Sequence, residues 1–293
     1  GANLSYVDLS EHDLTGTNLI DATLSHAKFS STSLKGKDLS GANLSYVDLS
    51  EHDLTGTNLS GTFLLRTNLS GMDLRHIPLA NVDFRYADLS ESKLPGSLLV
   101  NNNFDHATLK NINFAGKDLS ESSFQQVELE GSDMQNTNLR KSLFVQVDFT
   151  KIKNKSLAGA DFSYASFAHS NLSGVNLSGA ILLGTNFSKA NLSGLDFTVT
   201  DSITDGLIFI DANLSNSNFE GVDLTPKKMF SNIFENKAHL NNLPVEDLTE
   251  NLFGDFTNII LISTEVRGND LAVNYIFFNN FANANLENVN FKN

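Results

Sequence analysis

The apolar residues of this chain recur at every fifth position. From Leu4 to Phe149, thirty consecutive positions at this spacing hold twenty-nine leucines or phenylalanines and one methionine, Met134. An α-helix repeats at about 3.6 residues and a strand at 2, so neither can place a five-residue repeat on one face. If each unit of five forms one side of a square, four units close a coil of about twenty residues with the large side chains inside.

The residues around each apolar centre form a motif. Units such as Ala2-Asn3-Leu4-Ser5-Tyr6 and Ala42-Asn43-Leu44-Ser45-Tyr46 resemble the pentapeptide-repeat family, whose motif is Ala-(Asp/Asn)-Leu-x-x. The resemblance implies an all-β solenoid, a right-handed quadrilateral parallel β-helix. In this fold the centre and the residue two before it, here called the inner slot, face the shaft. About thirteen coils at ~4.8 Å would give a rod on the order of 60 Å long.

A break in the register marks a bulge. The centre after Phe149 is Leu157, eight residues on, so we expect residues 150–156 to form a basic bulge at one corner. If the bulge only loops out, the rings spaced by twenty residues stay on one side of the square across it. This side would hold Phe84, Phe104, Phe124, Phe144, Phe167 and Phe187. The pattern decays after Phe197 and resumes two residues out of phase at Leu214.

The remaining chain suggests three parts. Thr225-Pro226 and Leu243-Pro244 are typical of helix starts, because proline fits the first helical position and threonine can cap it. The pentad spacing returns from Phe256 to Phe291. We therefore predict a β-helix over 1–224, a helical insertion or joint over 225–255, and C-terminal pentapeptide coils over 256–293.

Composition and the ends of the sequence give limited information about the compartment and the assembly of the protein. The sequence has no cysteine, which excludes disulfides and thiolate metal sites within it. No apolar run is long enough to predict a membrane span, and no signal peptide is recognisable. The sequence starts and stops inside a repeat, and solenoid ends need caps or partners. We expect a fragment with a flanking domain or an end-to-end homodimer, in the bacterial cytoplasm or secreted as an effector without a classical signal peptide.

One segment is repeated without change. Residues 1–19 and 41–59 are identical, and their offset of forty equals two whole coils. A recent duplication, natural or deliberate, would leave every side of the square in register. A rod that tolerates lengthening favours a scaffold or spacer.

The sequence offers no catalytic constellation. The histidines are scattered, and no phosphate-binding loop or nucleophile elbow is present. We expect no enzyme, no cofactor and no metal. Four inner slots hold a basic residue where a small one is expected, and we expect these side chains to extend outward to water. They are His12, Lys37, His52 and Lys117.

Two charged features are candidate interaction sites. The net charge of −14 argues against an ordinary nucleic-acid binder. Acidic pairs recur every forty residues, about 9.6 Å apart along the rod, which indicates either a solvated face or a surface for a protein partner with a basic surface. This acidic stripe comprises Asp8, Glu11, Asp48, Glu51, Asp88, Glu91, Glu128 and Asp148. The second candidate is the bulge, with Lys151, Lys153 and Lys155.

Two functions fit these features. The first is a noncatalytic rod-like protein-interaction scaffold, or the repeat region of a larger bacterial, effector-like protein. The second comes from the resemblance: family members that confer quinolone resistance mimic B-DNA and bind gyrase, so the chain could modulate or protect DNA gyrase or topoisomerase. Those proteins use a hydrophobic C-terminal dimer interface, for which Ile276-Phe277-Phe278 is the candidate here. The partial stripe and the basic bulge favour the scaffold.

Overall fold

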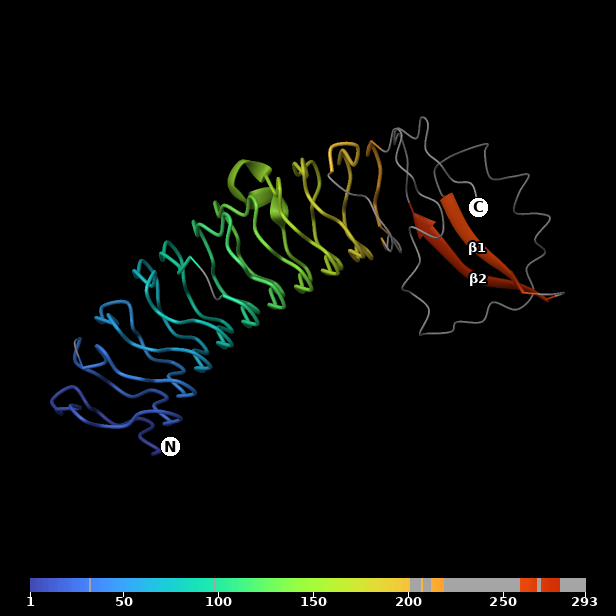
Figure 1. The fold of residues 1–293 in the computed structure, drawn as a ribbon. Coiled ribbons are helices and arrows are strands. Elements are labelled where there is room, and N and C mark those ends of the chain that lie inside the picture. Colours follow the sequence, from blue (N-terminus) through green and yellow to red (C-terminus); the bar gives the residue numbers. More distant parts are fainter. Residues whose placement is uncertain are drawn as a thin grey trace.

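The chain is a β-helical solenoid. The computed structural model describes residues 1–31, 33–96, 99–200, 207 and 212–218, and the backbone of 259–267 and 270–279. Coils stack along a rod from the N-terminal end (Figure 1). Neighbouring coils are joined by parallel bridges between residues twenty apart, such as Asn3 with Thr23 and Asp118 with Asn138. Four five-residue sides therefore close each coil, as the periodicity predicts.

Each corner of a coil is closed by the motif residues themselves. The carbonyl of Leu4 accepts the N–H of Val7 at 3.2 Å, and Tyr6 between them has a φ of 62°. This is the geometry of a type II turn, which needs a positive φ at its third residue. The side chain of Asn3 accepts the N–H of Ser5 at 3.1 Å. Asn or Asp before the centre is therefore part of the turn, and we call the residue two after the centre the corner residue.

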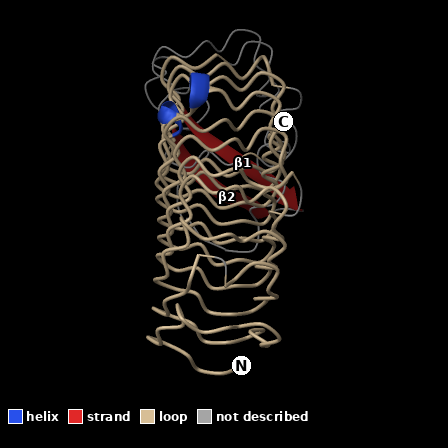
Figure 2. Cartoon of the chain, turned by 90° about the vertical axis from the view of Figure 1, so that its left-hand side faces the viewer, coloured by secondary structure: helices blue, strands red, loops and turns tan. Residues whose placement is uncertain are grey.

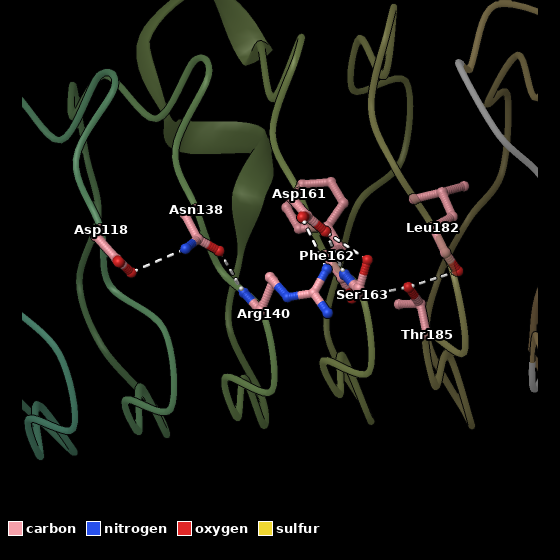
Figure 3. Close-up of polar contacts among 8 residues, drawn as sticks. All are labelled: Asp118, Asn138, Arg140, Asp161, Phe162, Ser163, Leu182 and Thr185. Atoms are coloured by element: carbon pink, nitrogen blue, oxygen red, sulfur yellow. Dashed lines mark hydrogen bonds and ion pairs between the residues drawn. The ribbon is translucent and has the colours of Figure 1, made fainter.

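The apolar centres form one continuous core. A single cluster of buried side chains runs from Leu9 to Leu214. Hydroxyls in the inner slots satisfy the carbonyls at the corners. The Oγ1 of Thr185 donates to the carbonyl of Phe162 at 3.0 Å and to that of Leu182 at 2.9 Å (Figure 3). The shaft thus has an apolar centre, and hydroxyls of its inner slots, such as those of Thr57, Thr137 and Thr185, donate to backbone carbonyls.

The bulge leaves the shaft intact. It comprises two short 3₁₀ turns, η1 (Phe149–Lys151) and η2 (Lys153–Lys155), at one edge of the stack (Figure 2). The ring of Phe144 stacks on that of Phe167 with centroids 5.0 Å apart, and Phe167 stacks on Phe187 at 5.5 Å. The prediction that the ring ladder crosses the bulge is confirmed.

The insertion has a defined position within its unit. Ile152 is buried and donates its N–H to the carbonyl of Phe149, so it fills the inner slot. Lys153 pairs with the coil before through an N–H bond to Ser132 at 2.9 Å, whereas Ser156 bridges to Asn176 in the coil after. The extra residues are Lys153–Lys155. Bridges across the bulge are accordingly offset by 23 residues, as in Leu143 with Ser166.

A second change of register lies farther along the rod. Asn191 bridges to Asn213 and Asp196 to Asn218, both with an offset of 22 residues. This confirms the predicted phase change of two residues before Leu214.

The C-terminal part differs from the predicted coils. Strands β1 (Ile259–Arg267) and β2 (Asp270–Asn279) pair antiparallel, with an irregularity between Ser263 and Thr264. Pentapeptide coils over 256–293 therefore do not describe these two segments. Both strands are rich in β-branched and aromatic residues, and the intervening sequence Gly268-Asn269 is of the kind that favours short hairpin loops.

Several predictions fall outside the described residues. The expected helices of 225–255 and the coils expected over 280–293 belong here. Ile276–Phe278 lie within β2, opposite Ile260–Ile262. Within the described ranges, no helix is both long and apolar enough to cross a membrane.

Removing one ring at the bulge tests whether the ladder holds the two halves of the shaft together. Phe144 is fully buried between Phe124 and Phe167. Phe144→Ala should lower the free energy of unfolding by about 3–5 kcal/mol through lost burial and a cavity. Urea unfolding followed by circular dichroism measures this. Phe144→Leu is the control, since leucine fills most other centres, and equal effects of the two changes would contradict the ladder's role.

Deleting the insertion tests the assignment of its position. Without Lys153–Lys155, Ile152 keeps the inner slot and Ser156 can pair with both neighbouring coils. The deletion loses the ion pair between the exposed Lys153 and the partly buried Asp133, and pairs near the surface are worth about 0–1 kcal/mol. We expect the thermal midpoint to change little. Deletion of Ile152–Asn154, also three residues, should lower the thermal midpoint strongly. A larger loss from deleting Lys153–Lys155 than from deleting Ile152–Asn154 would refute the assignment.

Candidate interaction surface

The structure gathers the acidic stripe on one face and one corner. Its aspartates and Glu128 lie on a single line of parallel bridges, which joins Asp8 to Lys28 and Asn68 to both Asp48 and Asp88. Glu11, Glu51 and Glu91 are corner residues at the border of this face, and all three are exposed. Asp148 is the last acidic residue on this line, which continues through Asn171 and Asn191.

The aspartates of the stripe also serve the fold. The Oδ1 of Asp48 accepts the N–H of Ser50 at 3.1 Å and its hydroxyl at 2.7 Å. The hydrogen bond from the Ser50 hydroxyl holds the pKa of Asp48 below its ordinary value, although burial opposes the shift. Asp148 makes the same bonds to Thr150. An aspartate here needs no partner to explain its presence.

Lysines neutralise part of the stripe. Lys28 lies 3.7 Å from Asp8, and Lys110 lies 2.8 Å from Glu128. Exposed pairs of this kind contribute little to stability. Among the described residues, no ion pair involves Glu11, Glu51 or Glu91. These three glutamates are the carboxylates most available to a partner.

The basic bulge lies at the end of the same corner. Lys151 is the corner residue one coil after Gly131. Its carbonyl accepts the N–H of Gly131. Lys153 pairs with Asp133 at 2.9 Å. Burial alone would raise the pKa of Asp133, but this bond and the N–H of Gln135 bring it below its ordinary value. Similar pairs join other coils, such as Arg140 with Asp161 (Figure 3). Lys151 and Lys155 remain exposed.

The basic residues of the inner slots behave differently from one another. His12 is exposed, as expected. Lys37 and Lys117 do not simply extend to water: the ammonium of Lys37 donates to the carbonyl of Leu14, and that of Lys117 to the carbonyl of Pro95 at 2.9 Å. Desolvation lowers the pKa of Lys117. Corner carbonyls therefore accept an ammonium as they accept the Thr57 hydroxyl elsewhere.

The remaining inner-slot residue has no polar contact. Both ring nitrogens of His52 are buried without a hydrogen-bond partner in the described part of the chain, and the ring meets Phe29 edge to face. Across the described ranges, no group of three or more His, Cys, Asp or Glu is placed to hold a metal ion.

The sequence analysis missed one exposed feature, a column of stacked side chains along a single corner. We call it the ring edge: Tyr6, His26, Tyr46, Arg66, Tyr86 and His106. His26 lies between two tyrosine rings with centroids 4.5 and 4.4 Å away. Tyr86 stacks on His106 at 4.5 Å, and the Arg66 guanidinium lies 4.9 Å from the Tyr86 centroid. The signal was present in the sequence, since these residues are spaced by twenty.

Comparison with known proteins gives one family. The family described as pentapeptide repeats matches in 8 copies, over residues 1–36, 24–61, 64–101, 103–140 and 156–198, which is more than half of the chain. Among curated proteins, nothing matches.

Solved structures with a similar fold include three repeat proteins. HetL of the cyanobacterium Nostoc sp. strain PCC 7120, involved in heterocyst differentiation regulation, is 21% identical over 99% of this chain and 86% of its own, with a TM-score of 0.34. QnrB1, a plasmid-mediated fluoroquinolone resistance protein, is 17% identical over 67% and 82%, with a TM-score of 0.32. A protein of the Arabidopsis thaliana thylakoid lumen is 27% identical over 36% and 68%, at 0.21. At these TM-scores the likeness carries no argument about function.

Acid titration separates the turn role of Asp48 from its charge. The pKa of Asp48 is lowered in the fold from 3.8, so its ionised form stabilises the fold above about pH 4, and this contribution is lost as pH falls through the folded pKa. Asp48→Asn keeps the acceptor and removes the titration. The unfolding free energy of wild type minus that of Asp48→Asn should therefore fall below about pH 4. A difference that is constant with pH would contradict this. Asp48→Ala should cost at most about 1 kcal/mol at pH 7, since water competes for the exposed group.

Proposed function

Because this chain belongs to the pentapeptide-repeat family, we propose that it acts as a noncatalytic scaffold that presents a rigid face to a protein partner with a basic surface. Members of the family are generally structural or interaction proteins rather than enzymes. The observation that supports the proposal is the continuous ring ladder through Phe144 and Phe167. It keeps surface columns in register on both sides of the bulge, so the rod presents a preformed surface and loses little entropy on binding.

The acidic stripe is the proposed contact surface. Its exposed glutamates recur every two coils, about 9.6 Å apart. Glu11, Glu51 and Glu91 would face basic groups of the partner, and charge complementarity of this kind speeds association and fixes the register of a complex. A rod joined to other modules of a larger bacterial protein would use the same face.

DNA mimicry directed at gyrase or topoisomerase is the second candidate, and the repeating carboxylates favour it. The charge density argues against it. Residues 1–150 hold 19 acidic and 11 basic side chains, which leaves about one net charge per 4–5 Å of rod at ~4.8 Å per coil. B-DNA carries one per about 1.7 Å. Residues 151–200 hold 2 acidic and 4 basic side chains, three of the basic ones in the bulge itself, so the acidity of the rod is interrupted at the bulge.

Partner capture with matched charge variants tests the scaffold. The stripe variant carries Glu11→Gln, Glu51→Gln and Glu91→Gln, which leaves the turn-forming aspartates in place. The control carries Asp21→Asn, Glu121→Gln and Glu130→Gln, which changes the net charge equally at other positions. We expect the immobilised wild-type rod to retain a protein from a bacterial lysate, the control to retain it, and the stripe variant to lose it. If both variants lost the partner equally, binding would depend on net charge alone and not on the acidic stripe.

Gyrase assays decide the second candidate. Supercoiling and cleavage by purified gyrase would be measured with micromolar wild-type rod, the stripe variant and the control. Inhibition or protection that disappears only in the stripe variant would establish mimicry and displace the scaffold proposal. Our expectation is no effect of any of the three proteins.

A further inference from the structure

The ring edge breaks a local rule at every coil. Ten successive corner residues on this corner have a φ between 53° and 63°, and none is glycine. They are Tyr6, His26, Tyr46, Arg66, Tyr86, His106, Gln126, Gln146, His169 and Lys189. The other three corners use glycine repeatedly, for example at Gly16 and Gly56, at Gly41 and Gly61, and at Gly71 and Gly131.

Large side chains are unfavourable in this backbone conformation. The Cβ atom crowds the neighbouring carbonyl at a φ near +60°, and a bulky residue there is an outlier. Ring stacking offsets part of this cost, yet it does not remove the rings from water. Tyr6 is 75% exposed, Tyr46 45% and Tyr86 46%. Glycine would close the same turns without strain, so the fold does not require these rings.

The ring edge has the properties of a binding surface. Strained residues that persist in a structure cluster at ligand-binding positions. Tyrosine and arginine are enriched at protein interfaces. The stacked rings are already ordered, because His26 is held between Tyr6 and Tyr46, so binding would cost little side-chain entropy.

The edge repeats every two coils together with the acidic face beside it. Each tyrosine is followed two residues later by an aspartate, in Tyr6-Val7-Asp8, Tyr46-Val47-Asp48 and Tyr86-Ala87-Asp88. The Lys28 side chain, whose ammonium lies 3.7 Å from Asp8, is 77% exposed, and a pair of this kind contributes little. Among the described residues, no ion pair involves Asp48 or Asp88. Three equivalent stations, each a tyrosine with a carboxylate, therefore lie about 9.6 Å apart.

This spacing selects the conformation of an extended partner. Side chains on one face of a β-strand repeat at roughly 6.6–6.8 Å, which does not match the stations. A polyproline II helix has three residues per turn and rises about 3.1 Å per residue, so every third side chain returns to one face after ~9.3 Å. Over three stations the mismatch stays below about 1 Å.

We propose that the ring edge and its adjoining aspartates bind an extended basic protein segment in the polyproline II conformation, with Lys or Arg at every third residue. The cations pair with Asp8, Asp48 and Asp88. The faces of the inner rings are occupied by stacking, so tyrosine hydroxyls donate to carbonyls of the segment, whose backbone has no internal hydrogen bonds. Arg66, between two stations, disfavours a segment with cations at every residue. The inference rests on the proposed scaffold function and names its partner chemistry.

Synthetic peptides of equal charge test the spacing. One probe is Arg-Pro-Pro repeated four times; the other has the same composition with the four arginines in one block. Fluorescence anisotropy with the full chain would measure the affinity of each at low and at physiological salt. We expect the spaced peptide to bind at least about tenfold more tightly than the block peptide. Equal affinities would overturn the inference.

Asparagine variants test the rings themselves. Tyr6→Asn, Tyr46→Asn and Tyr86→Asn together keep a residue that tolerates a positive φ and should weaken the spaced peptide about tenfold or more. Tyr164→Asn is the matched control, an exposed tyrosine with a φ of 61° on another corner, and should leave the affinity unchanged. The thermal midpoint of the triple variant should be equal to that of wild type or higher. A lower midpoint with unchanged affinity would assign the rings a structural role and overturn the inference.

Failure of this inference can be told apart from failure of the scaffold. If both peptides bind equally and binding depends on Glu11, Glu51 and Glu91 but not on the tyrosines, the ring edge is not the site and the scaffold stands. If neither peptide binds and partner capture also fails, both proposals fall.

Discussion

The register between successive coils is the constraint on which the rest of this structure depends. A parallel bridge such as that of Asn43 with Phe63 forms only when equivalent residues of two coils face each other. The same alignment lets Phe104 stack on Phe124 with centroids 5.0 Å apart. Backbone pairing and ring packing therefore require one repeat length. An insertion is therefore tolerated only where it loops out between two residues that keep their places in the coil. Lys153–Lys155 loop out in this way between the buried Ile152 and Ser156.

The regular shaft determines which positions of each five-residue unit can change residue type. The centre, the inner slot and the Asn or Asp before the centre each have a partner inside the coil stack, so their residue types are constrained by packing and by hydrogen bonds. The corner residue is constrained only in its backbone. Glycine satisfies it at least cost, and asparagine tolerates it. Where a corner instead carries Tyr46 or Tyr86, the turn does not require that side chain, and residues of this kind are commonly kept for function at a cost in stability.

Much of the fold could be predicted because its determinants are local and periodic. The five-residue spacing specified the coils, the core and the crossing of the bulge by Phe144 and Phe167. The hairpin was missed because Leu261, Val266, Leu271 and Ile276 satisfy a spacing of five. The residues between them include Ile262, Thr264, Val273 and Tyr275, which suit a continuous strand. The contacts of Lys37 and Lys117 were missed because the accepting carbonyls lie more than twenty residues away. The ring edge was missed although its spacing of twenty residues is visible in the sequence, because the turn geometry is needed to place the side chains of Tyr6, His26 and Tyr46 at one corner.

The acidity of the rod has two physical origins, and only one of them needs a partner to explain it. Asp48 and Asp148 accept backbone hydrogen bonds that close their corners, and asparagine does the same elsewhere, as at Asn43. Their charge can follow from the fold. Glu11, Glu51 and Glu91 close nothing with their side chains, and on the same corner Gly71 and Gly131 take equivalent places. These glutamates and the tyrosines of the ring edge share a period of two coils, although the core repeats at every coil. Between residues 1–19 and 41–59 this period follows from the repeated segment. Tyr86 and Glu91 recur at the same period in a segment that differs at most other positions, and it is this recurrence that favours a role at the surface.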